Sequence, residues 1–511
     1  MKSDAWLSKP FLTSIFLGIG GFLYGFDSGI ITPSLALGTF VNYFGNPPPP
    51  LRGAIVSMYQ AGAWLGSASV GITSDRLGRR KAIAFGCIWG VIGGAIMAGA
   101  AHVAMRKSVF ILWLNILTVV VIIGRMLVGF AVGTITGVSP VFGAEIAKTH
   151  ERAKVTAVNQ MMTAWGFFVA LWIGVAEGKW HSPNQWRLGF AIQSIPALIL
   201  GVGVLFLGES PRWLCLKGRH DEAEKAFRNY HFDGTNDEWC RTEFTVIQVN
   251  IAEEQQAQGR LSWGDLIKTP SFRKRLFVGS FVWAAAMLSG ISFVQYYQTA
   301  IYATLQFDQD RQLLVSGLYG SVAPVACLIS LFFVDKIDRK KILITSSSLL
   351  SVCYLIITIL AAKFPAVPGM STNAAAQRGL IACIFAVSAN YSALLGPMTW
   401  IIPPEVFTTE LRAKANAIVQ VVHYSISLII TQCSPIALAE VGWKYYILFV
   451  LTNALCALIF FFVYPETRGK SLEEIDEIFG DVKIVHEEDV KFSEKAGIDT
   501  IERRDSRVVS H

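Results

Sequence analysis

Asp75-Arg76-Leu77-Gly78-Arg79-Arg80-Lys81 is a charged cassette between two apolar runs, and a related cassette, Asp335-Lys336-Ile337-Asp338-Arg339-Lys340-Lys341, follows 260 residues later. A second pair of charges repeats at the same offset, from Glu145 to Glu405. Glu145 precedes Arg152 by seven residues, and Glu405 precedes Arg412 by seven. Two charged motifs that recur at one spacing indicate a duplicated chain, and transporters are often built from such repeats.

The composition indicates a membrane protein. The chain has 511 residues, of which 53% are hydrophobic and only 16% are charged, whereas soluble domains carry about 25% charged residues. About twelve apolar runs have the ~20 residues that cross ~30 Å of hydrocarbon. They begin near Phe11, Gly53, Ala82, Val109, Val155, Leu188, Leu276, Leu313, Ile342, Gly379, Ala413 and Tyr445.

The loops divide the chain into two halves and predict its orientation. Residues 11–207 and 275–464 each hold six apolar runs, and a polar, charged segment, 208–274, lies between them. Basic residues concentrate in the even-to-odd loops, so the positive-inside rule places residues 1–10, this segment and the tail 465–511 in the cytoplasm. The net charge of +7 is therefore no sign of nucleic-acid binding.

The sequence does not suggest an enzyme, a metal site or a cofactor. None of the eight cysteines has metal-ligand spacing, and six of them fall inside apolar runs. No set of nucleophile and base residues can be recognised. We therefore expect a function in transport or sensing.

Asp27 lies deep in the first apolar run, where a carboxylate costs about 3 kcal/mol on insertion scales. Arg125, in the fourth run, is its expected partner. In one interpretation Asp27 is a proton site, ionised when paired with Arg125 and protonated when Arg125 moves away. In the other, the two residues form a static ion pair that fixes helix register.

The cassettes also have two interpretations. Membrane anchoring explains their Arg and Lys residues, but it does not explain Asp75, Asp335 or the repeated glutamates. A seven-residue spacing is close to two helical turns, so Glu145 and Arg152 would share one face of a helix. An ion-pair network that forms a cytoplasmic gate accounts for all of these charges.

Taken together, these residues resemble the sugar porters of the major facilitator superfamily, particularly the fungal ones, over about residues 10 to 480. The resemblance rests on Gly25-Phe26-Asp27, the first cassette, Gly124-Arg125, Glu145 to Arg152, Trp186-Arg187, Glu209-Ser210-Pro211-Arg212-Trp213-Leu214, Tyr296-Tyr297, Gly396-Pro397 to Trp400, Glu405 to Arg412 and Pro465-Glu466-Thr467-Arg468-Gly469. It implies an all-α membrane protein with the major facilitator fold. Twelve transmembrane helices would form two six-helix bundles with a cytoplasmic helical insert, and the bundles would alternate access to a central sugar site.

The resemblance also implies roles for individual residues. Proton symporters of the family have an Asp at the position of Asp27, paired with the Arg at Arg125, and facilitative members lack that Asp. The cytoplasmic gate would consist of Asp75, Arg76, Arg79, Arg80, Glu145, Arg152, Glu209, Arg212, Asp335, Arg339, Glu405 and Arg412.

The sugar site carries over only in part. Gln160 and Trp400 match residues that bind and pack on the sugar. In the seventh span, hexose carriers have Gln-Gln-Leu-Ser-Gly-Ile-Asn where this chain has Ala286-Met287-Leu288-Ser289-Gly290-Ile291-Ser292, and the usual Asn-Trp of span eleven is His423-Tyr424. Because lost amides remove hydrogen bonds to hydroxyls, a free hexose would bind poorly unless other polar residues substitute. Candidates are Ser292, Gln295, Gln298, Asn390 and His423.

The predicted substrate-binding residues are Gln160, Ser292, Gln295, Tyr296, Tyr297, Trp400 and His423. For Gln295 the alternative is ordinary helix polarity, and for His423 it is a hydrogen bond between helices. We predict a monomeric proton–carbohydrate symporter of the plasma membrane whose partners are the sugar, the proton and the bilayer. Its substrate would be a disaccharide, pentose, polyol or sugar acid. A non-transporting sugar sensor, a facilitative carrier and an exporter of secondary metabolites remain alternatives.

Overall fold

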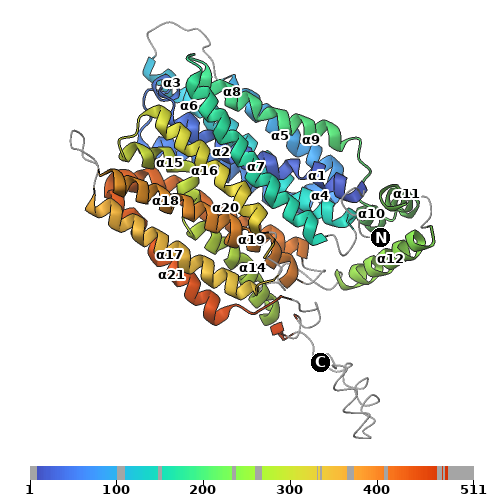
Figure 1. Cartoon of the computed structure of the whole chain (residues 1–511). Helices are drawn as coiled ribbons and strands as arrows, with labels where there is room; N and C mark the ends of the chain where they lie inside the picture. Colours follow the sequence, from blue (N-terminus) through green and yellow to red (C-terminus); the bar gives the residue numbers. More distant parts are fainter. Residues whose placement is uncertain are drawn as a thin grey trace, which may run out of the picture.

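The structure is a computed structural model, and it describes residues 9–99, 110–147, 152–232, 237–258, 268–330, 332–333, 336–364, 373–407, 412–468, 475 and 478–480. Every regular element in these ranges is a helix. The helices form two bundles that lie side by side, the first half in blue to green and the second in yellow to red (Figure 1).

The first bundle makes six passages of membrane length. They are α1 (Lys9–Leu17) with α2 (Ile19–Ala36), α4 (Pro49–Leu77), α5 (Arg79–Ala98), α6 (Phe110–Ile146), α7 (Arg152–Lys179), and α8 (Gln185–Ile192) with α9 (Ser194–Val204). A short helix, α3 (Gly38–Tyr43), follows the first passage.

The second bundle repeats this plan with more breaks. Its passages are α14 (Pro270–Leu288) with α15 (Ile291–Thr304), α16 (Gln309–Ser330), α17 (Arg339–Lys363), α18 (Ala374–Asn390) with the π-helix η4 (Tyr391–Leu395) and α19 (Gly396–Val406), α20 (Arg412–Val441), and η5 (Gly442–Lys444) with α21 (Tyr445–Val463). Gly290, at φ +82°, separates α14 from α15, a conformation that suits glycine. The predicted twelve-helix arrangement is confirmed.

Apolarity alone finds ten membrane-spanning stretches among the described residues, one of which, Ala415–Val463, contains both α20 and α21. The helix it misses is α4, which packs against α6 in its own bundle and α20 in the other. Because α4 lies between helices, it tolerates polar residues that lipid would not, and Ser57, Gln60 and Ser67 are all buried.

The packing shows the duplication that the cassettes predict. In the first bundle α2 packs on α7 and α5 packs on α9, and in the second α14 packs on α20 and α17 packs on α21. The bundles meet through two pairs, α4 with α20 and α7 with α16. Each pair joins the second passage of one half to the fifth passage of the other half. The interface therefore has an approximate two-fold symmetry.

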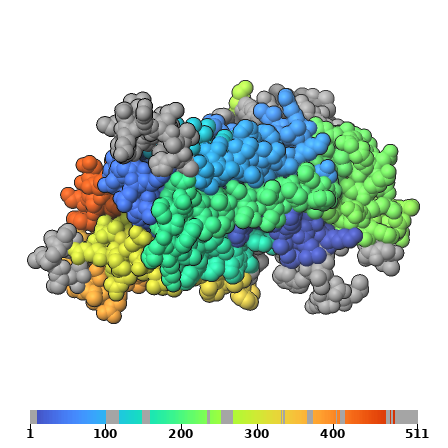
Figure 2. All heavy atoms as spheres, turned by 90° about the horizontal axis from the view of Figure 1, so that it is seen from above, coloured from blue at the N-terminus to red at the C-terminus, as the bar shows by residue number. Residues whose placement is uncertain are grey.

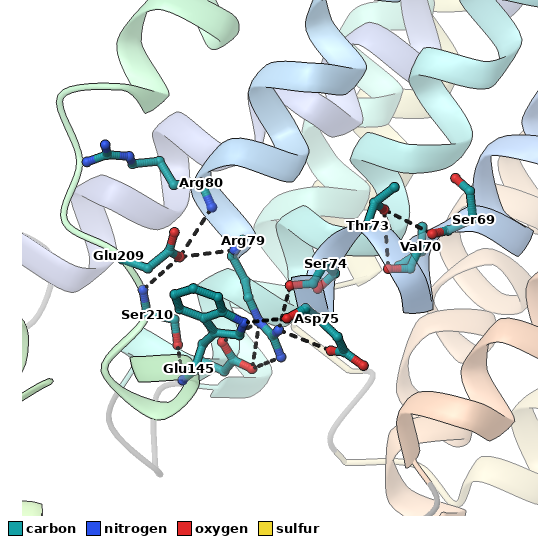
Figure 3. A network of polar contacts seen from close by, with 11 residues as sticks. Ser69, Val70, Thr73, Ser74, Asp75, Arg79, Arg80, Glu145, Glu209 and Ser210 are labelled. Atoms are coloured by element: carbon teal, nitrogen blue, oxygen red, sulfur yellow. Dashed lines mark hydrogen bonds and ion pairs between the residues drawn. The ribbon is translucent and has the colours of Figure 1, made fainter. Parts of the chain in front are cut away.

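The insert between the bundles consists of α10 (Pro211–Leu216), α11 (His220–His231) and α12 (Asp237–Gln258). These helices bury a small apolar core of Trp213, Leu214, Cys215, Ala223, Phe227, Cys240, Phe244 and Ile251. They lie at one end of the molecule, where Figure 2 shows them in light green. This is the end at which the first cassette lies (Figure 3).

The contact between α4 and α6 depends on glycine. A Cβ at Gly62 would lie 2.0 Å from the Met126 carbonyl oxygen, and one at Gly129 would lie 2.0 Å from the Tyr59 carbonyl oxygen. Both clashes are with backbone, so relief requires the helices to separate.

Gly62→Ala is therefore expected to lower the melting temperature of the detergent-purified protein clearly, because one methyl group forces two packed helices apart. Gly71→Ala is the matched control, since a Cβ at Gly71, also on α4, meets nothing within 4 Å. Equal melting temperatures for the two variants would contradict the close approach.

Candidate functional site

The first cassette is held by an ion pair between α5 and α6. Arg79 Nη2 lies 2.9 Å from Glu145 Oε1 and Arg79 Nε lies 3.1 Å from Glu145 Oε2, and both side chains are 9% exposed (Figure 3). Arg79 Nη1 also donates to the Ser74 carbonyl at 3.1 Å and lies 3.4 Å from Asp75 Oδ1. The expected helix face shared by Glu145 and Arg152 does not exist, because α6 ends at Ile146 and α7 begins at Arg152. Glu145 pairs instead with Arg79, and this pair joins α5 and α6 at a nearly buried point.

Glu209 caps the start of α5. Its Oε1 accepts hydrogen bonds from the backbone N–H groups of Arg79 at 3.0 Å and Arg80 at 3.3 Å. A carboxylate is stabilised at a helix N-terminus because the first N–H groups have no partner within the helix and the helix dipole is positive there. Glu209 follows the last passage of the first bundle, so it ties that passage to the cassette.

The second cassette has the same construction. The Glu466 carboxylate accepts from the backbone N–H groups of Arg339 and Lys340, both at 3.0 Å. The Arg339 guanidinium pairs with Glu405 at 3.5 Å, and Thr467 donates to the same carboxylate at 2.8 Å. Glu466 was not among the predicted gate residues.

A signal for Glu466 was present in the sequence. Glu209-Ser210 follows the last apolar run of the first half, and Glu466-Thr467 follows that of the second. Comparing the ends of the two halves would have found this second repeated acid.

The other predicted gate residues are less engaged. Arg76 is exposed, Arg212 is half-buried at the start of α10, and Arg80 donates to the Leu207 carbonyl at 3.0 Å. Asp335 and the side chains of Arg152 and Arg412 lie outside the described residues. The pairs Arg79–Glu145 and Arg339–Glu405 each stay within one bundle.

The insert is fastened to the same end by Tyr230. Its hydroxyl donates to the Gly208 carbonyl at 2.9 Å. Burial, with the nearby Glu209 carboxylate as a smaller cause, raises the pKa of Tyr230 to about 12, so this hydroxyl remains a donor at physiological pH. Trp213 adds a bond from its indole N–H to the Asp75 carbonyl at 3.2 Å.

Most of the hydrogen bonds described between the bundles lie toward the opposite end of the helices, whereas Thr136 and Tyr424, 3.5 Å apart, lie in the half nearer the cassettes. Gln60 donates to the Tyr296 hydroxyl at 2.8 Å, and Ser57 bonds Gln432 at 2.7 Å. Gln432 also donates to the Pro50 carbonyl at 3.2 Å. Further bonds are Thr32 to the Gln295 carbonyl at 2.8 Å, Thr299 to the Thr32 carbonyl at 3.3 Å, the Gly38 N–H to Gln309 at 3.1 Å, and Trp64 to Ser425 at 3.1 Å. These bonds join the bundles at the end away from the cassettes.

Asp27 and Arg125 lie next to each other in the first bundle, and neither side chain is exposed. Arg125 Nη1 donates to the main-chain carbonyl of Asp27 at 3.0 Å, and Arg125 Nε donates to the Ile55 carbonyl at 3.4 Å. Both carboxyl oxygens of Asp27 are buried without a hydrogen-bond partner. The guanidinium therefore bonds to the backbone of Asp27 and not to its carboxyl group.

Gln160 and Trp400 lie on the two sides of the bundle interface. The Gln160 amide nitrogen lies against Gly396, where an added Cβ would be 3.3 Å from it. Trp400 packs edge-on against Trp283, with ring centroids 5.2 Å apart, and both Gln160 and Trp400 are half-buried. These two residues therefore lie near the interface without being fully buried.

His423 belongs to an aromatic group in the second bundle. Its ring lies 4.3 Å from that of Trp283 and 4.4 Å from that of Tyr424. Its Nδ1 lies 3.3 Å from Gln420 Oε1, while Nε2 is buried without a partner. Trp283 and Gln420 were not predicted; Gln420 lies one helical turn before His423, so helical spacing could have found it.

The remaining predicted ligands differ in availability. Tyr297 donates to the Thr431 carbonyl at 2.7 Å, and Ser292 contacts the Met287 sulfur at 3.4 Å. Gln295 is half-buried, and Tyr296 takes part in the bond with Gln60. Of the possible substitutes, Gln298 bonds within α15, and Asn390 bonds Ser346. The seventh passage therefore offers Gln295 and Tyr296 to the interface.

Comparison with known proteins gives one family. The family described as "Sugar (and other) transporter" matches residues 13–479. The "MFS-type transporter criB" of Aspergillus cristatus is 34% identical over 94% of this chain and 95% of its own length. The "Glucose transporter GlcP" of Staphylococcus epidermidis is 30% identical over 92% of this chain and 97% of its own. The solved structure of the proton:xylose symporter XylE bound to 6-bromo-6-deoxy-D-glucose is similar in fold, with a TM-score of 0.75 at 22% identity over 92% of this chain and 99% of XylE.

Proposed function

This chain belongs to the Sugar (and other) transporter family of multi-pass membrane proteins, and from that premise we propose that it is a proton-coupled carbohydrate symporter. The relatives and structural neighbours are transporters and not enzymes. The proposal extends the family assignment in three respects: the coupling to protons, the carbohydrate substrate and the direction of uptake across the plasma membrane.

The observation that carries the coupling is the buried carboxyl group of Asp27. A carboxylate without a hydrogen-bond partner, removed from water, is strongly disfavoured, so this arrangement suits the neutral acid. Arg125 already bonds the main chain of Asp27 through Nη1, and its unpartnered Nη2 can pair with the carboxylate once the proton has left. Asp27 can thus exist as a neutral acid without a partner or as a carboxylate paired with Arg125, and a proton carrier requires two such states.

The placement of the polar contacts supports alternating access. Among the described residues, most hydrogen bonds between the bundles lie in the half of the helices away from the cassettes, and the pairs Arg79–Glu145 and Arg339–Glu405 each lie within one bundle. With the cassettes in the cytoplasm, this is an inward-facing arrangement. Residues 1–10, 208–274 and 465–511 would then be cytoplasmic, the bundles would span 11–207 and 275–464, and a single chain would hold the whole pathway.

The half-buried residues of the interface support a hydroxylated substrate. Gln160 offers an amide from the first bundle, and Trp400 offers an aromatic face from the second. The second bundle has Ala286 and Met287 at positions where hexose carriers have amides. A pentose, polyol, disaccharide or sugar acid therefore fits the site better than free glucose does.

Uptake of a panel of labelled sugars in yeast that lacks its own sugar carriers tests this proposal. We expect at least one non-glucose carbohydrate to enter, with glucose at least about tenfold weaker, because each lost hydrogen bond costs about 1 kcal/mol. External alkalinisation on adding that sugar would distinguish symport from facilitated transport and from a non-transporting sensor. If no carbohydrate enters, the proposal is wrong.

A second candidate is a carrier for another small metabolite. The aromatic group of Trp283, Trp400 and His423 makes the second half of the site less polar than a row of amides would. Relatives with the names "Probable metabolite transport protein CsbC" and "Putative metabolite transport protein YwtG", both of Bacillus subtilis, are each 28% identical to this chain. Export of a secondary metabolite by cells that express the chain, with no sugar uptake, would favour this candidate.

A further inference from the structure

A cluster of buried polar atoms without partners surrounds Arg125. It comprises both carboxyl oxygens of Asp27, the Tyr59 hydroxyl, Gln60 Oε1 and Arg125 Nη2, contributed by α2, α4 and α6. Buried polar groups in proteins nearly always have partners, so a group of them in one place indicates that their bonds change during function. The proton pair accounts for Asp27 and Arg125, but it leaves Tyr59 unexplained.

Tyr59 contacts the proton pair in two ways. Its ring lies under the Arg125 guanidinium, with Arg125 Cζ 4.7 Å from the ring centroid, which is a cation–π contact. Its side chain is fully buried, and it lies close enough to Asp27 for the two groups to interact electrostatically. The ring therefore holds the guanidinium while the hydroxyl remains free to bond.

We infer that Tyr59 is a positioning residue for proton coupling, whose hydroxyl donates a hydrogen bond to the Asp27 carboxylate after the proton leaves. This inference rests on the proposed proton coupling through Asp27. Asp27 loses its proton to water on the open side, and the carboxylate then receives bonds from Tyr59 and from Arg125 Nη2. In the proposed protonated state neither bond is needed, and in the structure both donors lack partners.

The other groups around Asp27 do not take this role. The elements packed against α2 carry, among their titratable and charged side chains, Arg125 and Glu145 on α6, Tyr296, Tyr297 and Tyr302 on α15, Glu177 and Lys179 on α7, Arg187 on α8, Asp310, Arg311, Tyr319 and Cys327 on α16, Tyr43 on α3 and Lys9 on α1; Tyr59 reaches Arg125 from α4, and α2 itself carries Tyr24. Tyr296 is bonded to Gln60 across the interface, and Tyr297 donates to Thr431. Glu177 accepts a hydrogen bond from the Gly189 N–H at 2.5 Å. Gly189 packs against Ile30, which lies about one turn after Asp27 on α2. Tyr59 is the neighbour of Arg125 with both a stacked ring and an uncommitted hydroxyl.

The direction in which loss of the Tyr59 hydroxyl shifts the protonation of Asp27 depends on the protonation state that the hydrogen bond stabilises. A hydrogen bond to the carboxylate stabilises the ionised form, so its removal makes Asp27 hold its proton to higher pH. Tyr59→Phe keeps the ring under Arg125 and removes only the hydroxyl. We expect it to move the protonation midpoint of Asp27 upward by about one pH unit, a tenfold change in proton affinity.

Infrared difference spectroscopy of the full-length protein in lipid vesicles measures this midpoint without any substrate. The protonated-carboxyl band that is present in the wild type and missing in Asp27→Asn belongs to Asp27, and its loss is followed as the pH is raised. In Tyr59→Phe the band should persist to higher pH, whereas in Tyr302→Phe it should match the wild type. Tyr302 is a suitable control because it is a fully buried tyrosine of α15, whose hydroxyl already bonds Gln298.

Two negative results have different meanings. An Asp27 band that titrates in the wild type and is unmoved in Tyr59→Phe would overturn the role of Tyr59 and leave the proton coupling intact. A wild-type spectrum with no titrating Asp27 band would refute the proton coupling itself. Tyr59→Leu, which removes ring and hydroxyl together, should disturb the band more than Tyr59→Phe does, because Arg125 also loses its stacking partner.

Discussion

Asp27→Asn is expected to abolish accumulation of the transported sugar against its gradient and to leave exchange of labelled for unlabelled sugar intact. Asparagine has nearly the size of the neutral acid, so the helices can still move, but its amide cannot take up and release a proton. One proton moving through 100 mV supplies about 2.3 kcal/mol, which sustains about a 50-fold gradient. In the variant this ratio should fall to about one.

Proteoliposomes with an imposed potential and pH difference measure both activities, with the sugar that the yeast panel shows to be taken up best. Glu222→Gln is the matched control, because Glu222 is an exposed carboxylate of the insert, paired with Arg219 and remote from the bundle interface. It should accumulate sugar as the wild type does. Undiminished accumulation by Asp27→Asn would rule out Asp27 as the proton carrier.

Arg79→Ala is expected to destabilise the protein by about 3–5 kcal/mol and to abolish uptake, because it leaves the Glu145 carboxylate nearly buried and unpaired. The same substitution in the second half, Arg339→Ala, should cost less. Its partner Glu405 is 29% exposed, and the pair is longer, at 3.5 Å against 2.9 Å. Unfolding of the detergent-purified proteins, followed by circular dichroism, compares the two variants.

The double variant Arg79→Met with Glu145→Leu separates folding from function. Replacing both charges with apolar side chains removes the unpaired carboxylate, so much of the lost stability should return. Uptake should not return, because the gate predicted at this cassette has lost its charges. Equal losses for Arg79→Ala and Arg339→Ala would show that burial does not determine the strength of these pairs.

Local sequence features predicted the charged framework well. Asp27, Arg125 and the two cassettes stand out because a charge in or beside an apolar run is costly and needs a partner. That Glu145 and Glu405 belong to ion-pair networks could be expected because the same charges recur at one spacing in both halves, but their partners Arg79 and Arg339 came from the structure. Such features depend only on composition and spacing along the chain.

The contacts that no spacing predicts depend on how helices pack. The Glu466 cap, the stacking of Trp283 on His423 and the position of Tyr59 under Arg125 each join residues of different helices. The sequence marks Tyr59 and Trp283 only as aromatic residues in apolar runs, and most such residues serve in packing. Their neighbours are set by helix rotation and by close approaches such as that at Gly62.

By itself, the sequence determined that this chain crosses the membrane as two related halves with matched charged cassettes, since hydrophobic length and repeated spacing are properties of the chain alone. Only the tertiary structure decided that Arg125 bonds the carbonyl of Asp27 while its carboxyl group is left without a partner, and that the bundles are bonded at the end away from the cassettes. The reason is physical. A buried polar atom must take the partner that helix packing brings within about 3 Å, and that choice is made in three dimensions.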